Sequence, residues 1–170
     1  TAITKTPNTA AAAEKASLEA LPREDVSQKE RAKIYYTAAK LQECQNGIEN
    51  RKAYLKTGYD TAKYFSPLLQ MYQYLQKCDS IDATPDSTGK VKIKYASKTR
   101  SLRKKHRSNI LNGGKFFLSK KNYAQAYPYF DFYLTYAKNP QDTTYAKYAR
   151  WATLCGYLSK SPQKTLRYIE

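Results

Sequence analysis

Glycine, methionine, tryptophan and histidine are all scarce in this sequence, and it lacks long apolar runs. Its 170 residues include 6 Gly, 1 Met, 1 Trp and 1 His. So few glycines argue against a fold of many short strands joined by glycine-rich turns. No run of about eighteen apolar residues occurs, so we predict no transmembrane helix.

Acidic residues are scarce in the second half of the chain. Residues 1–85 carry 12 basic and 10 acidic side chains, whereas residues 86–170 carry 18 and 4. Nine of the basic residues fall within residues 90–107, "KVKIKYASKTRSLRKKHR", a segment without an acid. A field of this sign attracts polyanions and anionic lipid head groups without specificity, and it does not determine the fold.

Groups suited to catalysis or metal binding are few. The one histidine, His106, lies among cations rather than beside a carboxylate, so we predict a solvated surface residue. The sequence "GGK" at residues 113–115 lacks the full spacing of a phosphate-binding loop. We therefore predict no catalytic residue, no metal site and no cofactor, and hence a protein that is not an enzyme.

The cysteines are Cys44, Cys78 and Cys155. Their odd number and wide spacing give neither a disulfide framework nor a metal-ligand motif. We expect three small buried hydrophobic residues. A Cys44–Cys78 bridge between neighbouring helices is the alternative in an oxidising compartment.

Helical patterns fill most of the first half of the chain. Ser27 followed by Glu30 is the signature of a capping box, and apolar residues at helical spacing follow it. We predict an N-terminal tail with a short helix over residues 1–26. A helical hairpin is predicted over residues 27–81.

Two positions complicate the helices of this hairpin. Asn46-Gly47 interrupts the apolar pattern, so we expect the first helix to stop there and to resume beyond it. Pro67 suits the first turn of a helix capped by Ser66. It equally suits a bend in a longer helix begun at Asp60, and the sequence does not separate these alternatives.

Residues 82–98 form the one long connector that we predict. "PDSTGK" has the composition of a turn, and "KVKIKY" alternates as a strand would, although no partner strand is evident. We therefore expect an exposed basic loop, after which helices resume near Thr99.

The C-terminal part, residues 99–170, contains an internal repeat. "LSKKNYAQAYPYF" aligns with "LSKSPQKTLRYI" when Asn122 is matched to Ser161, an offset of 39 residues. The last unit stops abruptly, so we expect it to be truncated. The chain also lacks an initiator Met, which indicates a processed or excised piece of a longer protein.

The first of these units resembles a tetratricopeptide repeat, which is about 34 residues long. The matching residues are Gly114, Phe117, Tyr123, Ala126 and Phe130. The resemblance implies an all-α fold in which antiparallel helix pairs stack into a right-handed solenoid. It also implies that Gly114 and Ala126 are small because two helices cross closely there, and that the aromatic residues fill the space between helices.

A weaker echo lies upstream, within the predicted hairpin. In "TGYDTAKYF", Tyr59 and Ala62 occupy the positions of Tyr123 and Ala126. Any first repeat is therefore a degenerate one, followed by the long basic loop.

The resemblance also bears on function and location. It implies a non-catalytic scaffold that binds a protein or peptide partner, and the sensor region of a larger signalling protein is an alternative. The tyrosine- and lysine-rich composition is similar to that of uncharacterised exported tetratricopeptide proteins of the Bacteroidetes. That similarity implies a periplasmic or cell-surface location, with a cytoplasmic one as the alternative.

In a stack of such repeats, the first helices of successive units line a groove. Lys115, Lys147 and Arg150 would make this groove cationic, which suits an acidic peptide or a C-terminal carboxylate. The positions that the family pattern assigns to the groove are Ser108, Asn112, Lys115, Leu118, Lys147, Arg150, Leu154 and Tyr157.

The basic segment 90–107 supports a second hypothesis, nucleic-acid or polyanion binding. In a helix, Arg100, Arg103, Lys104 and Arg107 share one face, and phosphate contacts need little more. Base stacking needs exposed aromatic rings beside the charges, however, and the aromatic residues after this segment follow the core positions of the repeat. We therefore favour the protein-binding hypothesis.

Overall fold

The structure, a computed structural model, describes residues 26–86, 88–137 and 143–169 together with Ala12, Lys15, Leu18 and Glu19. The tail and helix predicted over residues 1–26 lie almost wholly outside these residues, although the four isolated ones are helical. No strand occurs in the described part of the chain, which confirms the all-α prediction.

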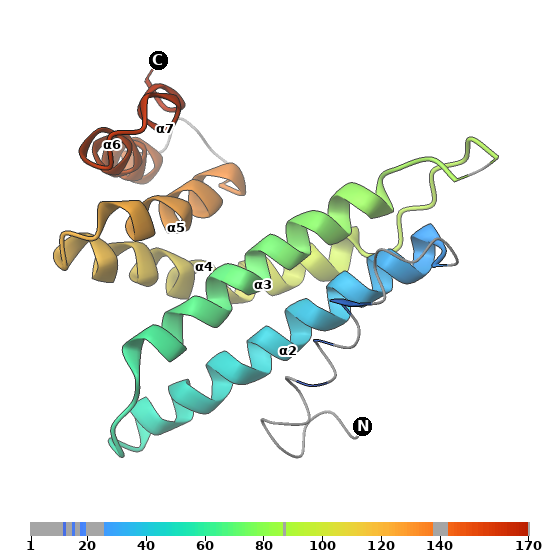
Figure 1. Cartoon of the computed structure of the whole chain (residues 1–170), viewed down its shortest axis with the longest axis horizontal. Coiled ribbons are helices and arrows are strands. Elements are labelled where there is room, and N and C mark those ends of the chain that lie inside the picture. Colours follow the sequence, from blue (N-terminus) through green and yellow to red (C-terminus); the bar gives the residue numbers. More distant parts are fainter. Residues whose placement is uncertain are drawn as a thin grey trace. The chain divides into compact units, whose positions relative to one another are not determined.

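Six helices are described (Figure 1). They are α2 (Gln28–Tyr54), α3 (Thr61–Asp82), α4 (Ala96–Ser119), α5 (Tyr123–Thr135), α6 (Thr143–Leu158) and α7 (Pro162–Leu166). The chain divides into two compact units, residues 1–105 (unit 1) and residues 106–170 (unit 2), so the division falls within α4.

The helix α2 begins as predicted but continues further than expected. Ser27 and Glu30 form the capping box, with the Ser27 hydroxyl accepting from the Glu30 N–H at 3.3 Å. The predicted interruption at Asn46-Gly47 is wrong, because α2 is continuous to Tyr54. Asn46 is buried and donates its side-chain N–H to the Tyr64 carbonyl at 2.6 Å. Packing against α3 thus offsets the cost of a mid-helix glycine, about 1 kcal/mol.

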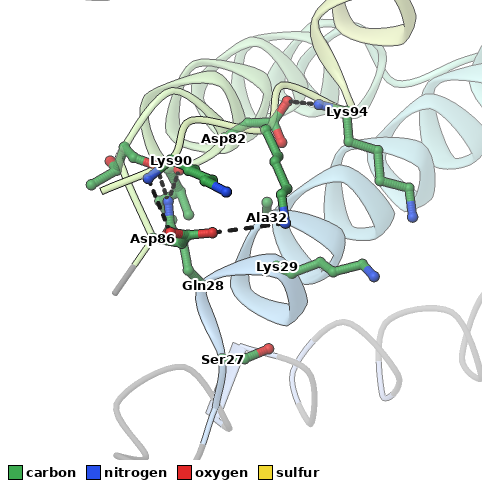
Figure 2. Close-up of a pocket in the computed structure, with 11 residues that line it drawn as sticks. Ser27, Gln28, Lys29, Ala32, Asp82, Asp86, Lys90 and Lys94 are labelled. Atoms are coloured by element: carbon green, nitrogen blue, oxygen red, sulfur yellow. Dashed lines mark hydrogen bonds and ion pairs between the residues drawn. The ribbon is translucent and has the colours of Figure 1, made fainter. Parts of the chain in front are cut away.

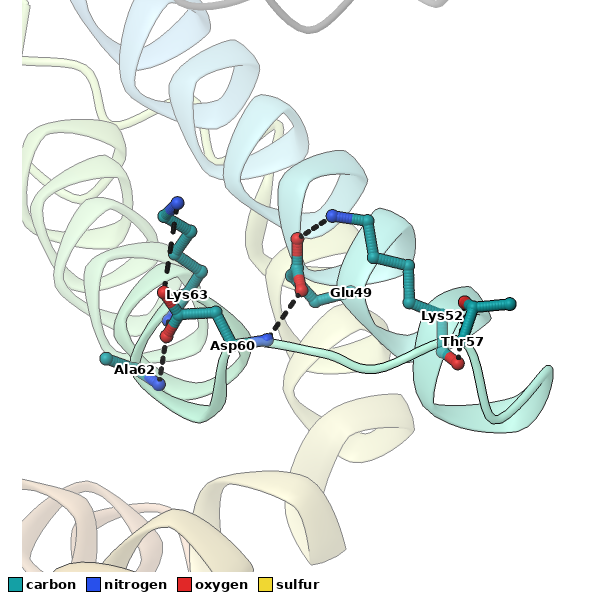
Figure 3. A network of polar contacts seen from close by, with 6 residues as sticks. All are labelled: Glu49, Lys52, Thr57, Asp60, Ala62 and Lys63. Carbon is teal, nitrogen blue, oxygen red and sulfur yellow. Dashed lines mark hydrogen bonds and ion pairs between the residues drawn. The ribbon is translucent and has the colours of Figure 1, made fainter.

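Polar contacts fix the turn between α2 and α3 (Figure 3). Glu49 accepts from the Lys52 ammonium at 2.7 Å and from the Asp60 backbone N–H at 3.1 Å. These two hydrogen bonds lower the pKa of Glu49, with the Lys52 contact the larger cause. Asp60 in turn caps α3 by accepting from the backbone N–H groups of Ala62 and Lys63.

The cap at Asp60 decides the position of Pro67. Because α3 starts at Thr61, Pro67 lies inside the helix and Ser66 does not cap it. The second alternative, a longer helix begun at Asp60, is therefore correct.

The helices α2 and α3 lie side by side and antiparallel in unit 1 (Figure 1). Their contact at the open end of the hairpin centres on Ala32, Cys78 and Tyr95, with Tyr35, Tyr36 and Ile81 packed around them. The Cys78 thiol donates to the Ala32 carbonyl at 3.3 Å, and burial raises the pKa of this thiol to about 12.

All three cysteines are free thiols. Cys78 and Cys155 are buried as predicted, but Cys44 is exposed on α2, so the prediction is wrong for that residue. The alternative Cys44–Cys78 bridge is not formed.

The connector between α3 and α4 is shorter than predicted, because α3 ends at Asp82 and α4 starts at Ala96 rather than near Thr99. The Asp82 carboxylate accepts from the backbone N–H groups of Lys94 and Tyr95, at 2.7 and 2.6 Å. Tyr95 is buried, and this anchoring lets α4 begin early.

Within unit 2, two turns share one geometry. Lys121 and Lys160 both have a left-handed backbone, with φ of 57° and 56°. Asn122 N–H donates to the carbonyl five residues before it at 2.9 Å, and Ser161 N–H does the same at 3.0 Å. These turns lie 39 residues apart, the offset at which the two sequences align.

Each turn in unit 2 joins a pair of closely crossing helices. A Cβ on Gly114 would lie 2.8 Å from the Phe130 ring, and Ala126 and Phe130 are fully buried, as the family pattern predicts. A Cβ on Gly156 would lie 2.6 Å from the backbone nitrogen of Thr165. Gly156 thus makes the crossing of α6 with α7, a role that sequence reasoning missed.

The upstream echo of the repeat has the wrong register. Ala62 is exposed, whereas Ala126 is fully buried. Tyr59 precedes the cap residue Asp60, whereas Tyr123 is the first residue of its helix. The position of the N-cap sets which residues of a helix face inward. The sequence similarity alone does not take the N-cap into account.

Candidate functional site

Unit 2 carries a large excess of positive charge. Residues 106–170 include ten basic and three acidic side chains. The one acid described in unit 2, Asp131, is bound internally: it lies 3.1 Å from the Arg167 guanidinium and accepts from the Tyr168 hydroxyl at 2.7 Å. Among the described residues of unit 2, no carboxylate is therefore left to neutralise Lys115, Lys147 or Arg150.

A group of aromatic side chains surrounds Tyr148 of α6. The Phe130 ring stacks on the Tyr148 ring with centroids 6.1 Å apart and planes 12° apart. Tyr133 and Trp151 meet the same ring edge-on, at 5.2 and 5.3 Å. Tyr148 is buried, so these neighbours hold its ring in one orientation.

Two predicted groove lysines meet at this ring. The Lys115 ammonium of α4 lies 5.6 Å from the Tyr148 ring centroid, and the Lys147 ammonium of α6 lies 5.9 Å from it. Lys147 also lies 5.1 Å from the Trp151 centroid. Such contacts are worth about 0.5–1 kcal/mol each at exposed sites, so they bias the ammonium positions without removing them from solvent. Both lysines are exposed beside one ring, so a carboxylate can reach either ammonium group.

A second group of predicted residues lines a cleft beside α6. Arg150, Leu154 and Tyr157 contribute to a cleft of about 1120 Å³ that also involves Leu134 of α5 and Arg167 and Ile169 beyond α7. Leu154 and Tyr157 are 44% and 69% exposed, respectively. Three of the four predicted groove residues of α6 thus line a cleft that combines apolar side chains with the cations Arg150 and Arg167.

The remaining predicted groove residues lie on α4. Ser108 and Asn112 are exposed and Leu118 is half-buried. The spacing of Ser108, Asn112 and Lys115 puts these three on one side of the helix. Ser108 and Asn112 extend the exposed face of α4 around Lys115 but carry no charge themselves.

The predicted polyanion patch is wrong at Arg103. Arg100 and Lys104 are exposed, but Arg103 is buried and lies 2.6 Å from the Asp79 carboxylate of α3. In unit 2, Arg107 is exposed, and its guanidinium carbon lies 4.9 Å from the Tyr133 ring centroid.

His106 is buried, with 7% of its surface exposed, which overturns its prediction as a surface residue. Thr99, Arg103, His106 and Ile110 are all buried and recur at helical spacing, so they form the inward face of α4. Sequence reasoning equated charge with exposure and therefore missed this face.

Tyr148 is a further residue that sequence reasoning missed. Its contact with Lys115 joins two different helices, and no local pattern records such a contact. The sequence signal that could have indicated this site was the repeat alignment, because it places Lys115 and Lys147 on the first helices of neighbouring units.

Metal-ligand clusters and membrane-spanning helices are both absent from the described residues. No group of three or more His, Cys, Asp or Glu side chains in that part of the chain is placed to hold a metal ion. No helix there combines the length and apolarity needed to cross a membrane.

Comparisons with known proteins returned no match among family models, curated proteins or solved structures.

Proposed function

We propose that this protein is a non-catalytic helical-repeat scaffold of the tetratricopeptide type, and that unit 2 binds an acidic segment of a protein partner. The observation that carries the proposal is the approach of Lys115 and Lys147 to the single ring of Tyr148. The shared geometry of the turns at Lys121 and Lys160 supports a repeated helix pair, as a solenoid requires.

The surroundings of the two lysines suggest the chemistry of the bound segment. Exposed ammonium groups pair with carboxylates, and charge-assisted hydrogen bonds of this kind are among the stronger ones. Leu154 is exposed on the same helix as Lys147, so an apolar side chain of the ligand has a surface to cover. We therefore expect a segment with acidic residues next to at least one apolar residue.

The proposal is tested by selecting peptides from a random library on the immobilised full chain. We expect acidic sequences to be enriched. The affinity of one selected peptide is then measured for Lys147→Glu and Lys115→Glu at about 150 mM salt, where long-range attraction is screened. Each variant should lose about tenfold or more in affinity, equivalent to about 1.4 kcal/mol.

Lys120→Glu is the matched control, because Lys120 is an exposed lysine at the end of α4 with its ammonium 6.0 Å from the Phe116 ring. It makes the same charge change away from Tyr148 and should leave the affinity within about twofold, since rim charges contribute little. Equal losses in all three variants would mean that the peptide responds to net charge alone, and the proposal would fail.

The second hypothesis, polyanion binding through the face of α4, is weakened by the burial of Arg103 against Asp79. The exported location and the role as a sensor region stay predictions.

A further inference from the structure

A second cleft, of about 800 Å³, lies within unit 1 (Figure 2). Four lysines line it: Lys29 from the first turn of α2, and Lys90, Lys92 and Lys94 from the connector before α4. Cleft volumes of roughly 300–1000 Å³ are typical of sites for small molecules.

The backbone of the connector explains the positions of three of these four lysines. Its sequence "KVKIK" alternates, and an extended backbone directs alternate side chains to opposite sides. Lys90, Lys92 and Lys94 line the cleft, whereas Val91 and Ile93 do not and are 48% and 61% exposed. The alternation that resembled a strand in the sequence therefore aligns three lysines without any strand pairing.

Two carboxylates anchor the ends of this segment. Asp82 accepts from the Lys94 backbone N–H at 2.7 Å, and Asp86 accepts from the Lys90 backbone N–H at 3.1 Å. Asp86 also accepts from the Thr88 backbone N–H at 2.9 Å. Both ends of the lysine segment are thus held by backbone hydrogen bonds.

The fourth lysine is brought to the cleft by α2. The Gln28 side chain donates to the backbone carbonyls of Ile81 and Thr84, which ties the start of α2 to the end of α3. Lys29 is the next residue, and Figure 2 shows its side chain and that of Lys94 running to the same side of the view.

The charges of the cleft do not balance. Its lining includes Asp82 and Asp86 against four lysines, and the Asp82 carboxylate serves backbone N–H groups. Among the described residues, the ion pair between a carboxylate and a lining ammonium joins Asp86 and Lys92, at 4.0 Å. The lysine ammonium groups are exposed, so a ligand can reach them.

We propose that this cleft binds a compact polyanion with several tetrahedral oxyanion groups, either phosphate or sulfate esters. Lysine ammonium groups are common partners of such oxyanions, and four of them around one cleft match a ligand with three or more negative charges. All the residues involved belong to unit 1, so the site is independent of the peptide-binding face proposed for unit 2.

The test is calorimetric titration of the full chain at about 150 mM salt, where long-range attraction is screened. Inositol hexakisphosphate is the phosphate-ester probe, and inositol hexasulfate, which carries its groups on the same ring, is the sulfate-ester probe. Tighter binding of one probe identifies the ester class, and binding of either at the cleft supports the proposal. Backbone amide resonances should shift within residues 27–32 and 82–95.

The variants Lys92→Ala and Lys94→Ala should each weaken binding of the better probe by about tenfold, which corresponds to about 1.4 kcal/mol. Both lysines are exposed, so the substitutions leave the core unchanged. Lys33→Ala is the matched control: Lys33 is exposed on α2, one turn after Lys29, and does not line the cleft. It should change the affinity by less than about twofold.

Three results would overturn the proposal. The first is no measurable binding of either probe. The second is an equal loss for Lys33→Ala and the cleft variants, since net charge alone would then explain the binding. The third is tighter binding of duplex DNA than of either probe, with a steep dependence on salt, which is the signature of non-specific attraction to a polyanion.

Discussion

Ion pairs join α4 to α2 and α3 in unit 1, whereas aromatic rings join α6 to α5 in unit 2. In unit 1, Glu43 of α2 pairs with Lys105 of α4 at 2.7 Å, and Asp79 of α3 pairs with Arg103 of α4 at 2.6 Å. In unit 2, the corresponding contacts between helices are made by rings such as Phe130 on Tyr148.

This difference explains how one basic chain can hold two kinds of cationic site. Most described acids of unit 1 are engaged by N–H groups or cations of the same unit, which leaves an excess of lysines at the connector. Unit 2 has too few acids for such pairing, and its lysines lie over rings instead. The first arrangement presents charge around a cleft, and the second presents it on an aromatic surface.

The largest effect is expected from Phe130→Ala. Phe130 is fully buried, and its ring contacts Tyr148, Trp151 and the Gly114 backbone. Truncating a buried phenylalanine typically lowers the free energy of unfolding by about 3–5 kcal/mol. Trp151 is the single tryptophan of the chain, so urea denaturation followed by its fluorescence reports the loss in unit 2.

Tyr157→Ala is the control for this change, because Tyr157 lies on the neighbouring helix α6 and is 69% exposed. Its effect should stay within about 0.5 kcal/mol. A loss below about 1 kcal/mol for Phe130→Ala would contradict an aromatic core in unit 2.

A smaller loss is expected from Asp79→Ala in unit 1. The substitution leaves Arg103 buried without its carboxylate partner and removes the acceptor of the Thr99 hydroxyl, which lies 2.6 Å away. Breaking a buried ion pair on one side costs about 3–5 kcal/mol. Because the Asp79 side chain is 32% exposed, we expect about 3 kcal/mol, measured by urea denaturation with far-UV circular dichroism.

The double variant Asp79→Leu with Arg103→Met separates charge burial from packing. Replacing a whole buried pair by apolar residues is often neutral, so this variant should regain most of the stability that the single variant loses. If the double variant is as unstable as the single one, packing rather than charge holds α3 to α4.

The sequence predicted features whose cause is local. The capping box at Ser27 and Glu30 depends on two side chains three residues apart, and the structure contains it. The small residues Gly114 and Ala126 matched a known spacing, and the structure places them at a close helix crossing. In both cases the residues that form the sequence pattern are also the residues that make the contact.

Features that depend on distant parts of the chain could not be predicted in this way. Arg103 is buried because Asp79, twenty-four residues earlier in the sequence, supplies its counter-charge. The cleft in unit 1 brings Lys29 next to the segment of Lys90 to Lys94, and only the α2–α3 hairpin makes them neighbours. Charge patterns identify basic residues, but their partners decide which of them face solvent.

The smallest effect, and the only gain in stability, is expected from Gly47→Ala. Gly47 lies inside α2, and a Cβ there would meet no atom within 4 Å. Alanine restricts the unfolded chain more than glycine and costs nothing in the folded helix, so the free energy of unfolding should rise by about 0.5–1 kcal/mol. Urea denaturation followed by far-UV circular dichroism measures this gain.

Gly156→Ala is the matched change in unit 2, and it should have the opposite sign. Its Cβ would lie 2.6 Å from the Thr165 backbone nitrogen and 2.7 Å from the Lys164 carbonyl carbon, and neither atom can move as a flexible side chain would. Overpacking of this kind costs about 1–3 kcal/mol. If both alanines stabilise the protein, α6 and α7 do not cross as closely as the structure shows, and the contrast between an open glycine in unit 1 and an enclosed one in unit 2 is lost.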